Sequence, residues 1–266
     1  MKRHYLSLWL LLLGAFVIFA IASAYELPAI GGHQPKSSGI AEALFGENAD
    51  AGLMPEDSPI AIADTVAADV ATFPMPCDTA VQTILLIGDS MLEGLGPRLA
   101  AYAEQNGHTL YTVMWYSSTS EVWGRSDKLK GYIRRLEPSY IVVCLGANEL
   151  LVSDIAKKRE KYVRKIISDI DTIPYLWIGP PNWRRDTGIN ELIAANTPKG
   201  AFFLSDGMTF ERAKDGAHPT RSSAAAWLDS VMRWMPANAL HPIRMESPQK
   251  PSAKAKRIFV HQPNER

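Results

Sequence analysis

Ser90 stands where a short apolar run gives way to polar and glycine residues. The run Ile84–Ile87 has no polar alternation, which is typical of a strand covered on both faces of a parallel sheet, and Gly88 and Asp89 separate it from Ser90. Ligands of such sheets bind beyond the carboxyl ends of the strands, where a helix N-terminus also favours developing negative charge. Ser90 is therefore a candidate nucleophile.

His218 and Asp215 are the candidate partners of that serine. Of the six histidines, His218 is the one that we place in a loop together with a carboxylate, Asp215. A neutral imidazole can take a serine proton, while a carboxylate fixes its tautomer and stabilises the imidazolium that forms. The pair predicts acid–base chemistry at Ser90, and a surface histidine beside a solvated aspartate is the plainer alternative.

Asn148 follows the apolar run 140–145 and is a candidate oxyanion donor. Its side-chain N–H can donate to a negatively charged oxygen, and the nearby Gly146 lets the backbone approach closely. The alternative for Asn148 is a cap of the following helix, and Asp89-Ser90 is likewise an ordinary helix start. Placement at strand ends favours the catalytic interpretation.

Strands and helices are expected to alternate from about residue 83 to residue 234. Apolar runs predict strands at 84–87, 108–115, 140–145, 175–178 and 201–204. Helical spacing predicts helices at 95–105, 126–136, 153–170 and 220–234, with Thr220 as the cap of the last. The alternation predicts an α/β domain with a parallel sheet of about five strands and helices on both faces.

The polar segments resemble three conserved blocks of the SGNH/GDSL hydrolase superfamily of serine esterases and lipases. The matching segments are Gly88-Asp89-Ser90, Gly146-Ala147-Asn148 and Asp215-Gly216-Ala217-His218, within about residues 83–234. The resemblance implies a flavodoxin-like three-layer α/β/α sandwich, with Ser90 as nucleophile, His218 as general base and Asp215 as the orienting acid. It also implies an oxyanion hole made by the Ser90 backbone N–H and the Asn148 side chain.

Two positions depart from the family pattern. The second block normally supplies a glycine N–H to the oxyanion hole, whereas this chain has Tyr116-Ser117-Ser118-Thr119-Ser120 after the second expected strand. A serine N–H donates equally well in the right backbone conformation, so Ser118, and next to it Ser117, is the candidate. The third block usually continues with aspartate, but here Glu149 follows Asn148.

Asn182 and Trp183 follow the fourth expected strand and so face the same sheet edge. Trp183 can stack on a sugar ring or line an acyl pocket, with Trp115 and Trp123 as further candidates. Simple packing is the alternative for a loop tryptophan. Asn182 and Trp183 are the candidate substrate-binding residues.

The composition excludes several classes of site and partner. The formal net charge of +0 gives no indication of a nucleic-acid partner. The two cysteines form no CxxC or Cys/His cluster that would suggest a metal site, and acyl-enzyme chemistry requires neither a metal nor an organic cofactor. Cys144 is expected to be a small buried thiol, and a disulfide with Cys77 is the alternative in an exported protein.

The regions outside the expected domain differ from it in composition. Cations followed by an apolar run predict a membrane anchor at 1–24. The alternative is a signal peptide that is cleaved after Ala24. In both cases the domain is expected to be exported, to the periplasm or the extracellular space. Residues 25–80 read as a flexible spacer, 81–236 as the hydrolase domain and 237–266 as a basic, disordered tail.

The sequence thus predicts an exported carboxylic ester hydrolase that works through an acyl-enzyme. Its expected substrate is an O-acetyl group on a polysaccharide or other glycan. A lipase, lysophospholipase or thioesterase with the same three residues is the main alternative, followed by an acetyltransferase. An inactive glycan-binding protein of the same fold is the alternative outside the enzymes.

Overall fold

The computed structural model describes residues 76–265, so the expected anchor at 1–24 and nearly all of the spacer at 25–80 lie outside the described residues. Between residues 76 and 265, none of the helices has both the length and the apolar character needed to span a bilayer. The expected boundary of the domain near residue 81 falls just before the first strand.

One parallel sheet of six strands forms the centre of this region, in the order β5-β4-β3-β1-β2-β6. The strands are β1 (Thr83–Gly88), β2 (Thr109–Trp115), β3 (Tyr140–Cys144), β4 (Tyr175–Ile178), β5 (Phe202–Phe203) and β6 (Arg257–His261). Read from β2 to β5, the order 2-1-3-4-5 is the flavodoxin-like arrangement. The predicted parallel α/β sheet is confirmed, with β6 in addition.

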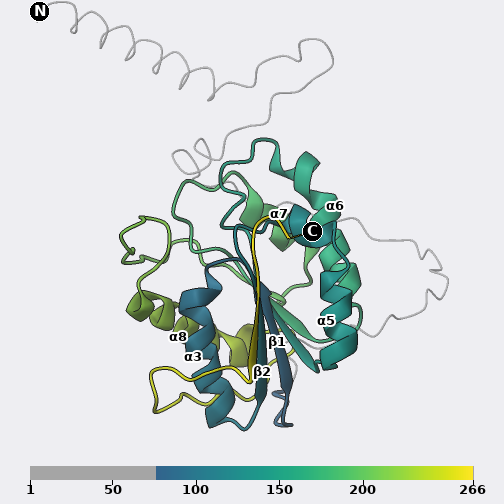
Figure 1. Cartoon of the computed structure of the whole chain (residues 1–266). Helices are drawn as coiled ribbons and strands as arrows, with labels where there is room; N and C mark the ends of the chain where they lie inside the picture. Colours follow the sequence, from purple (N-terminus) through teal and green to yellow (C-terminus); the bar gives the residue numbers. More distant parts are fainter. Residues whose placement is uncertain (1–75, 266) are drawn as a thin grey trace, which may run out of the picture. The chain divides into compact units, whose positions relative to one another are not determined.

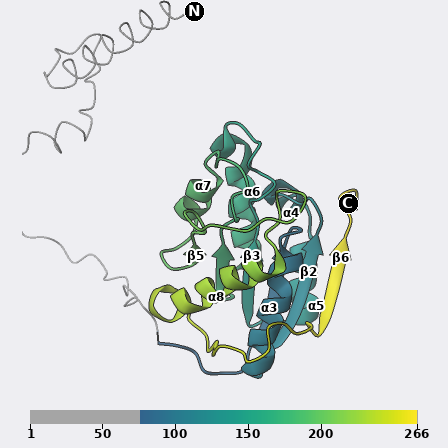
Figure 2. The same ribbon diagram turned by 90° about the vertical axis from the view of Figure 1, so that its left-hand side faces the viewer.

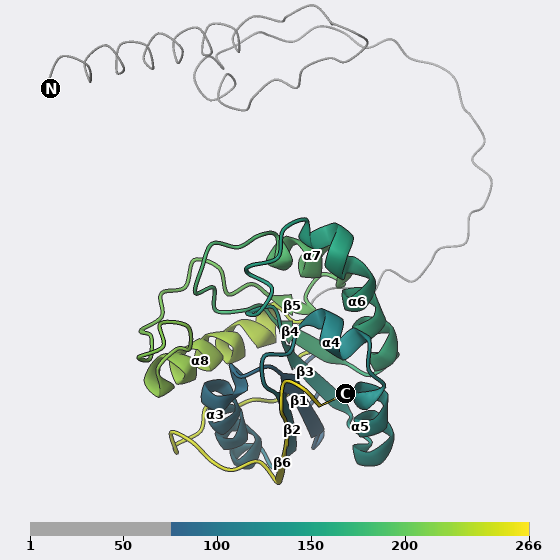
Figure 3. The same ribbon diagram turned by 45° about the horizontal axis from the view of Figure 1, so that its top comes forward.

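Helices cover both faces of the sheet (Figures 1 and 3). One layer is made by α3 (Leu92–Gln105) and α8 (Arg221–Asn238), and the other by α4 (Ser120–Gly124), α5 (Lys128–Leu136), α6 (Ile155–Ile170) and α7 (Ile189–Asn196). In β1, Ile84 and Leu86 pack with the first layer, whereas Leu85 and Ile87 pack with the second. Because successive strand residues point to opposite faces, an unbroken apolar run is needed at this central position.

The sequence did not predict α4 and α7. Helix α4 has five residues and α7 has eight, so each gives too few turns for a recognisable apolar periodicity. The expected helix at 126–136 is correspondingly shortened to α5. The cap of α8 is confirmed, because Thr220 Oγ1 accepts a hydrogen bond from the Ser223 N–H at 3.3 Å.

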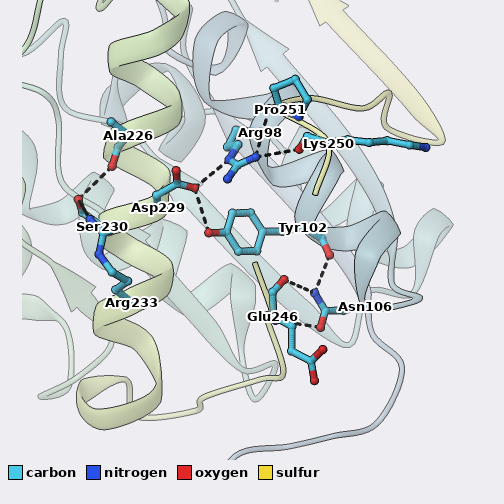
Figure 4. Close-up of polar contacts among 10 residues, drawn as sticks. All are labelled: Arg98, Tyr102, Asn106, Ala226, Asp229, Ser230, Arg233, Glu246, Lys250 and Pro251. Atoms are coloured by element: carbon cyan, nitrogen blue, oxygen red, sulfur yellow. Dashed lines mark hydrogen bonds and ion pairs between the residues drawn. The ribbon is translucent and has the colours of Figure 1, made fainter. Parts of the chain in front are cut away.

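The disordered tail expected at 237–266 is wrong for its described part. Figure 4 shows how this segment is held against α3: Arg98 Nη1 donates to the carbonyl of Lys250 at 2.9 Å, and the Glu246 N–H donates to Asn106 Oδ1 at 2.9 Å. The chain then continues into β6, which lies beside β2 at the sheet edge (Figure 2). Because this segment is rich in prolines and cations, the sequence did not predict its short edge strand.

The two cysteines are free thiols, as the simpler of the two expectations had it. Cys77 and Cys144 are both free, and Cys144 is buried in β3. A disulfide between them is therefore absent from this structure.

Candidate active site

The sheet reverses its order between β1 and β3, and this is where Ser90 and Asn148 lie. The chain passes from β1 to β2 on one side and then crosses to β3 on the other. Gly88 pairs with Cys144 at the carboxyl ends of these strands, and a Cβ on Gly88 would lie 2.2 Å from the Cys144 carbonyl oxygen. Only glycine permits this approach, which brings the two following loops together at the usual ligand position of the fold.

Ser90, His218 and Asp215 form one hydrogen-bonded series. Ser90 Oγ lies 2.8 Å from His218 Nε2, and His218 Nδ1 lies 2.8 Å from Asp215 Oδ2. With the Nδ1 proton directed at the carboxylate, Nε2 is left to accept the serine proton. The structure therefore brings together the three residues that the sequence singled out.

The Asp215 carboxylate is held in its ionised form. Its Oδ1 accepts the backbone N–H groups of His218 at 3.0 Å and Ala217 at 2.8 Å. The pKa of Asp215 is lowered to about 2. The largest cause is the hydrogen bond from the His218 N–H, followed by the bond from the Ala217 N–H and the bond from the His218 ring. A fixed negative charge thus faces the imidazole at neutral pH.

Arg212 holds the loop that carries His218. Its Nη1 donates to the carbonyl of Ala217 at 2.8 Å, and its Nη2 donates to the carbonyl of Asn182 in the loop after β4 at 2.8 Å. The His218 carbonyl accepts the Ala213 N–H at 2.8 Å. The imidazole therefore sits on a loop tied to itself and to a neighbouring loop of the sheet edge.

Asn148 joins the loops that follow β1, β2 and β3. Its Nδ2 donates to the Ser118 carbonyl at 2.9 Å and, less favourably, to Asp89 Oδ2 at 3.4 Å. The longer bond is the one that an incoming oxyanion can replace most easily. Asn148 is thus placed beside Ser90, with its amide already oriented by the loop after β2.

Ser118 is not available as the backbone donor that the sequence favoured. Its N–H donates to the Trp115 carbonyl at 3.1 Å, its Oγ accepts the Trp123 Nε1 proton at 3.0 Å, and the residue is buried. Ser117, the second candidate, is exposed, has a left-handed φ of 55°, and its N–H donates no hydrogen bond within the described region. It occupies the left-handed conformation that favours glycine.

Glu149 is a buried carboxyl that holds the loop after β2 from the other side. Its Oε1 accepts the Ser120 N–H at 2.5 Å, while its Oε2 is buried without a hydrogen-bond partner among the described residues. Burial raises the pKa of Glu149. Burial also raises the pKa of Asp89 to about 7, with the charge of Glu149 as a further cause. Sequence reasoning noted Glu149 only as a departure from a pattern.

Trp183 and Asn182 are engaged within the domain. Trp183 Nε1 donates to the Ala147 carbonyl at 3.0 Å, and the Arg184 guanidinium lies 4.7 Å from the centre of a Trp183 ring. Asn182 Oδ1 accepts a long bond from Asn190 Nδ2 at 3.5 Å. Their contact with substrate stays a prediction.

The other candidate tryptophans are core residues. Trp115 is 3% exposed and Trp123 is 0% exposed, so neither can contact a substrate in this conformation.

Within residues 76–265 no group of histidine, cysteine, aspartate and glutamate side chains has the arrangement of a metal site.

No protein-family model and no curated protein matches the chain. Among solved structures, the psychrotrophic esterase EstA from Pseudoalteromonas sp. is 20% identical, with a TM-score of 0.41 over 57% of this chain and 97% of that one. TesA is 19% identical, with a TM-score of 0.46 over 57% and 97%. The Clostridium thermocellum family 3 carbohydrate esterase is 16% identical, with a TM-score of 0.41 over 57% and 94%. Likenesses at this level add no argument to the strand order and hydrogen bonds described above.

Proposed function

We propose that this chain is an exported serine esterase of the SGNH/GDSL hydrolase superfamily. The observation that carries the proposal is the series Ser90 Oγ–His218–Asp215, with both hydrogen bonds at 2.8 Å. Nucleophile, base and orienting acid in this order are the arrangement that serves acyl transfer on several unrelated folds.

The geometry supports a two-step reaction. Ser90 Oγ attacks the ester carbonyl carbon while its proton passes to His218 Nε2, and Asp215 stabilises the imidazolium. His218 then gives the proton to the leaving alcohol, and an acyl-Ser90 ester remains. In the second step His218 takes a proton from water, the hydroxide adds to the acyl group, and the proton returns to Ser90 as the acid leaves.

Three N–H groups are assigned to the oxyanion. Within the described residues, the backbone N–H groups of Ser90 and Ser117 donate no hydrogen bond, so both are open to a ligand. Asn148 Nδ2 supplies the third donor by giving up its 3.4 Å bond to Asp89. Donors fixed before the reaction stabilise the developing charge without reorganisation, and each contributes a few kcal/mol to the transition state.

The proposed substrate is an O-acetyl group on a glycan. The side chains of His218 and Asp215 are 33% and 52% exposed, so the reaction centre lies open at the surface. An open centre suits a small acyl group presented by a large polymer, and the expected export of the domain would place it among envelope or extracellular polysaccharides. Acetate release from acetylated glycans tests this choice, whereas activity that rises with acyl-chain length would favour a lipase or thioesterase.

Labelling with a fluorophosphonate probe tests the central claim. We expect the full chain to be labelled once, at Ser90, and the Ser90→Ala variant to be unlabelled and inactive on p-nitrophenyl acetate. Ser222→Ala is the matched control, because Ser222 is an exposed serine at the start of α8. Labelling that persists in Ser90→Ala, or equal inactivity of wild type and variant, would contradict the proposal.

A further inference from the structure

A hollow of about 650 Å³ opens between the loops that follow β3 and β4. It is lined by Leu150, Leu151, Arg184, Arg185, Asp186 and Thr187. Both loops start at the carboxyl edge of the sheet, which is also the edge of Ser90. We call this feature the arginine hollow; its volume lies in the range of small-molecule sites.

The one carboxylate that lines the arginine hollow, Asp186, offsets only part of its positive charge and forms no ion pair with either arginine. Arg184 and Arg185 are exposed, and neither guanidinium has an ion pair within residues 76–265. Asp186 is committed to the start of α7, where it accepts the N–H groups of Gly188 at 2.8 Å and Ile189 at 2.9 Å. The hollow therefore presents two guanidinium groups without an ion pair, of which that of Arg184 lies over the Trp183 ring.

Four other arginines of the described residues form ion pairs, whereas several, among them Arg134, Arg135 and Arg212, form none. Arg98 meets Asp229 at 2.8 Å, Arg159 meets Glu121 at 2.7 Å, and Arg164 meets Glu160 at 2.8 Å. Arg184 and Arg185 are distinguished by their place, because both line one hollow at the carboxyl edge of the sheet, and the hollow therefore offers a place for an external anion.

One side of the arginine hollow is bonded to the loop of Asn148. Trp183 Nε1 donates to the carbonyl of Ala147, the residue before Asn148, at 3.0 Å. Thr187 Oγ1 donates to the carbonyl of Glu149, the residue after Asn148, at 3.3 Å. The loop with the two arginines is therefore bonded to the residues on both sides of Asn148, the residue assigned to the oxyanion.

The other side is bonded to the loop of His218. Arg212 Nη2 donates to the Asn182 carbonyl and its Nη1 to the Ala217 carbonyl, both at 2.8 Å. The loop that carries the arginine hollow is thus bonded to the loop of His218 through Arg212, a further positive charge that has no ion pair within the described chain.

We propose that the arginine hollow binds an anionic group of the ester substrate, and that its ligand class is a carboxylated sugar such as a uronic acid residue of an acylated glycan. This inference rests on the proposed function. A guanidinium fork matches a carboxylate in two parallel hydrogen bonds. Leu151, whose side chain is exposed, supplies an apolar contact for the C–H face of a sugar ring. A phosphate offers the same oxygen chemistry and is separated from a carboxylate by experiment.

The test compares O-acetylated methyl glucoside, methyl glucuronide and methyl glucoside 6-phosphate, which share a ring and differ in the group at C6. We expect kcat/KM for acetate release to be roughly tenfold or more higher for the glucuronide than for the glucoside. About 0.5 M salt should weaken this preference. Stronger preference for the 6-phosphate would make phosphate the ligand and overturn the uronic acid assignment.

The Arg184→Gln/Arg185→Gln variant removes both forks. We expect its kcat/KM on the glucuronide to fall roughly ten- to hundredfold, with activity on neutral p-nitrophenyl acetate unchanged. The matched control is Arg134→Gln/Arg164→Gln, which removes the same charge from α5 and α6 and should leave the preference intact. Equal kinetics for the two double variants, or no preference in wild type, would overturn the proposal.

A binding measurement separates this inference from the proposed function. Titration of Ser90→Ala with unesterified methyl glucuronide and methyl glucoside needs no catalysis. Binding of the glucuronide that is lost in Ser90→Ala/Arg184→Gln/Arg185→Gln supports the hollow even if every ester assay fails. Equal binding of the two sugars would reject it even if the chain is an active esterase.

Discussion

The backbone N–H of Tyr116 donates a hydrogen bond to the carbonyl oxygen of His261 at 3.0 Å. Beside it, Trp115 Nε1 donates to the Gln262 carbonyl at 2.9 Å. The His261 ring is in turn held by the Tyr132 hydroxyl at 2.8 Å. The edge strand β6 is therefore bonded to the start of the loop that carries Ser117.

We expect β6 to be needed for catalysis more than for folding. A chain that ends at Lys256 loses β6 but keeps β1 to β5 and their two helical layers. Its loop after β2 lacks the bond from Tyr116, so kcat on p-nitrophenyl acetate should fall about tenfold while KM changes little, as for loss of an oriented transition-state donor.

The matched control ends at Gln262, which retains β6 and the carbonyl groups of His261 and Gln262. It should keep wild-type kcat, with far-ultraviolet circular dichroism reporting the fold of both chains. If the shorter chain does not fold, Val260→Pro tests the same strand in the full chain. Wild-type kcat in a folded protein without β6 would contradict the prediction.

Asn148→Ala should lower kcat about 10²- to 10³-fold, because it removes one oxyanion donor. It also frees the Ser118 carbonyl, so the loop after β2 loses one of its fixed points. The control is Asn238→Ala, which removes an amide that donates to the Trp234 carbonyl on the exposed side of α8. Stopped-flow acylation kinetics measure the step concerned, and a change confined to KM would count against the assignment.

Ser117→Gly should be more stable than Ser117→Ala by about 1 kcal/mol, because a Cβ disfavours the left-handed φ of 55°. Both variants keep the backbone N–H, so both should hydrolyse p-nitrophenyl acetate within about threefold of wild type. Urea denaturation measures the difference in unfolding free energy. Greater stability of the alanine variant would show that this backbone conformation is not the one in solution.

Asp89 makes the unfolding free energy depend on pH. Burial raises the pKa of Asp89 from 3.8 to about 7, so the folded chain binds more protons than the unfolded chain between these values. The stabilising contribution of Asp89 is complete below about pH 4 and is lost as pH rises towards 7, on the order of 4 kcal/mol. Glu149, whose pKa is also raised, acts in the same direction.

Urea denaturation at about pH 4.5 and pH 7.5 measures this loss. Burial lowers the pKa of His241, which works in the opposite direction, so the comparison is between wild type and Asp89→Asn. The unfolding free energy of the variant should fall less between the two pH values. An identical pH slope in both proteins would mean that Asp89 is ionised in the folded state across the range.

The sequence was sufficient to predict the parallel sheet and the grouping of Ser90, His218 and Asp215, because both leave local signals. Buried strands such as β1 and β3 are continuous apolar runs, and the polar residues directly after them must gather at one edge. Ser90 and Asn148 follow from this rule, and His218 follows from its loop carboxylate. The three-dimensional hydrogen bonds then agree with the expected series.

Other features depend on information that no short segment contains. Ser117 and Ser118 have the same side chain, and only the φ angle and the partner of each N–H distinguish them. β6 pairs with a strand far away in the sequence and alternates exposed and packed residues, so its composition resembles that of a solvated tail. The arginine hollow needs two loops that only the fold brings together.

Because β6 lies at the edge of the sheet, we expect it to open before the rest of the domain when the protein is heated. An outermost strand is bonded on one side only and opens at a lower free-energy cost than strands at the centre of a sheet. Each such opening removes the backbone partner of Tyr116 while β1 and β3 stay packed. Activity should consequently disappear on warming before the domain melts, so that the edge of the sheet, and not its core, limits the working temperature.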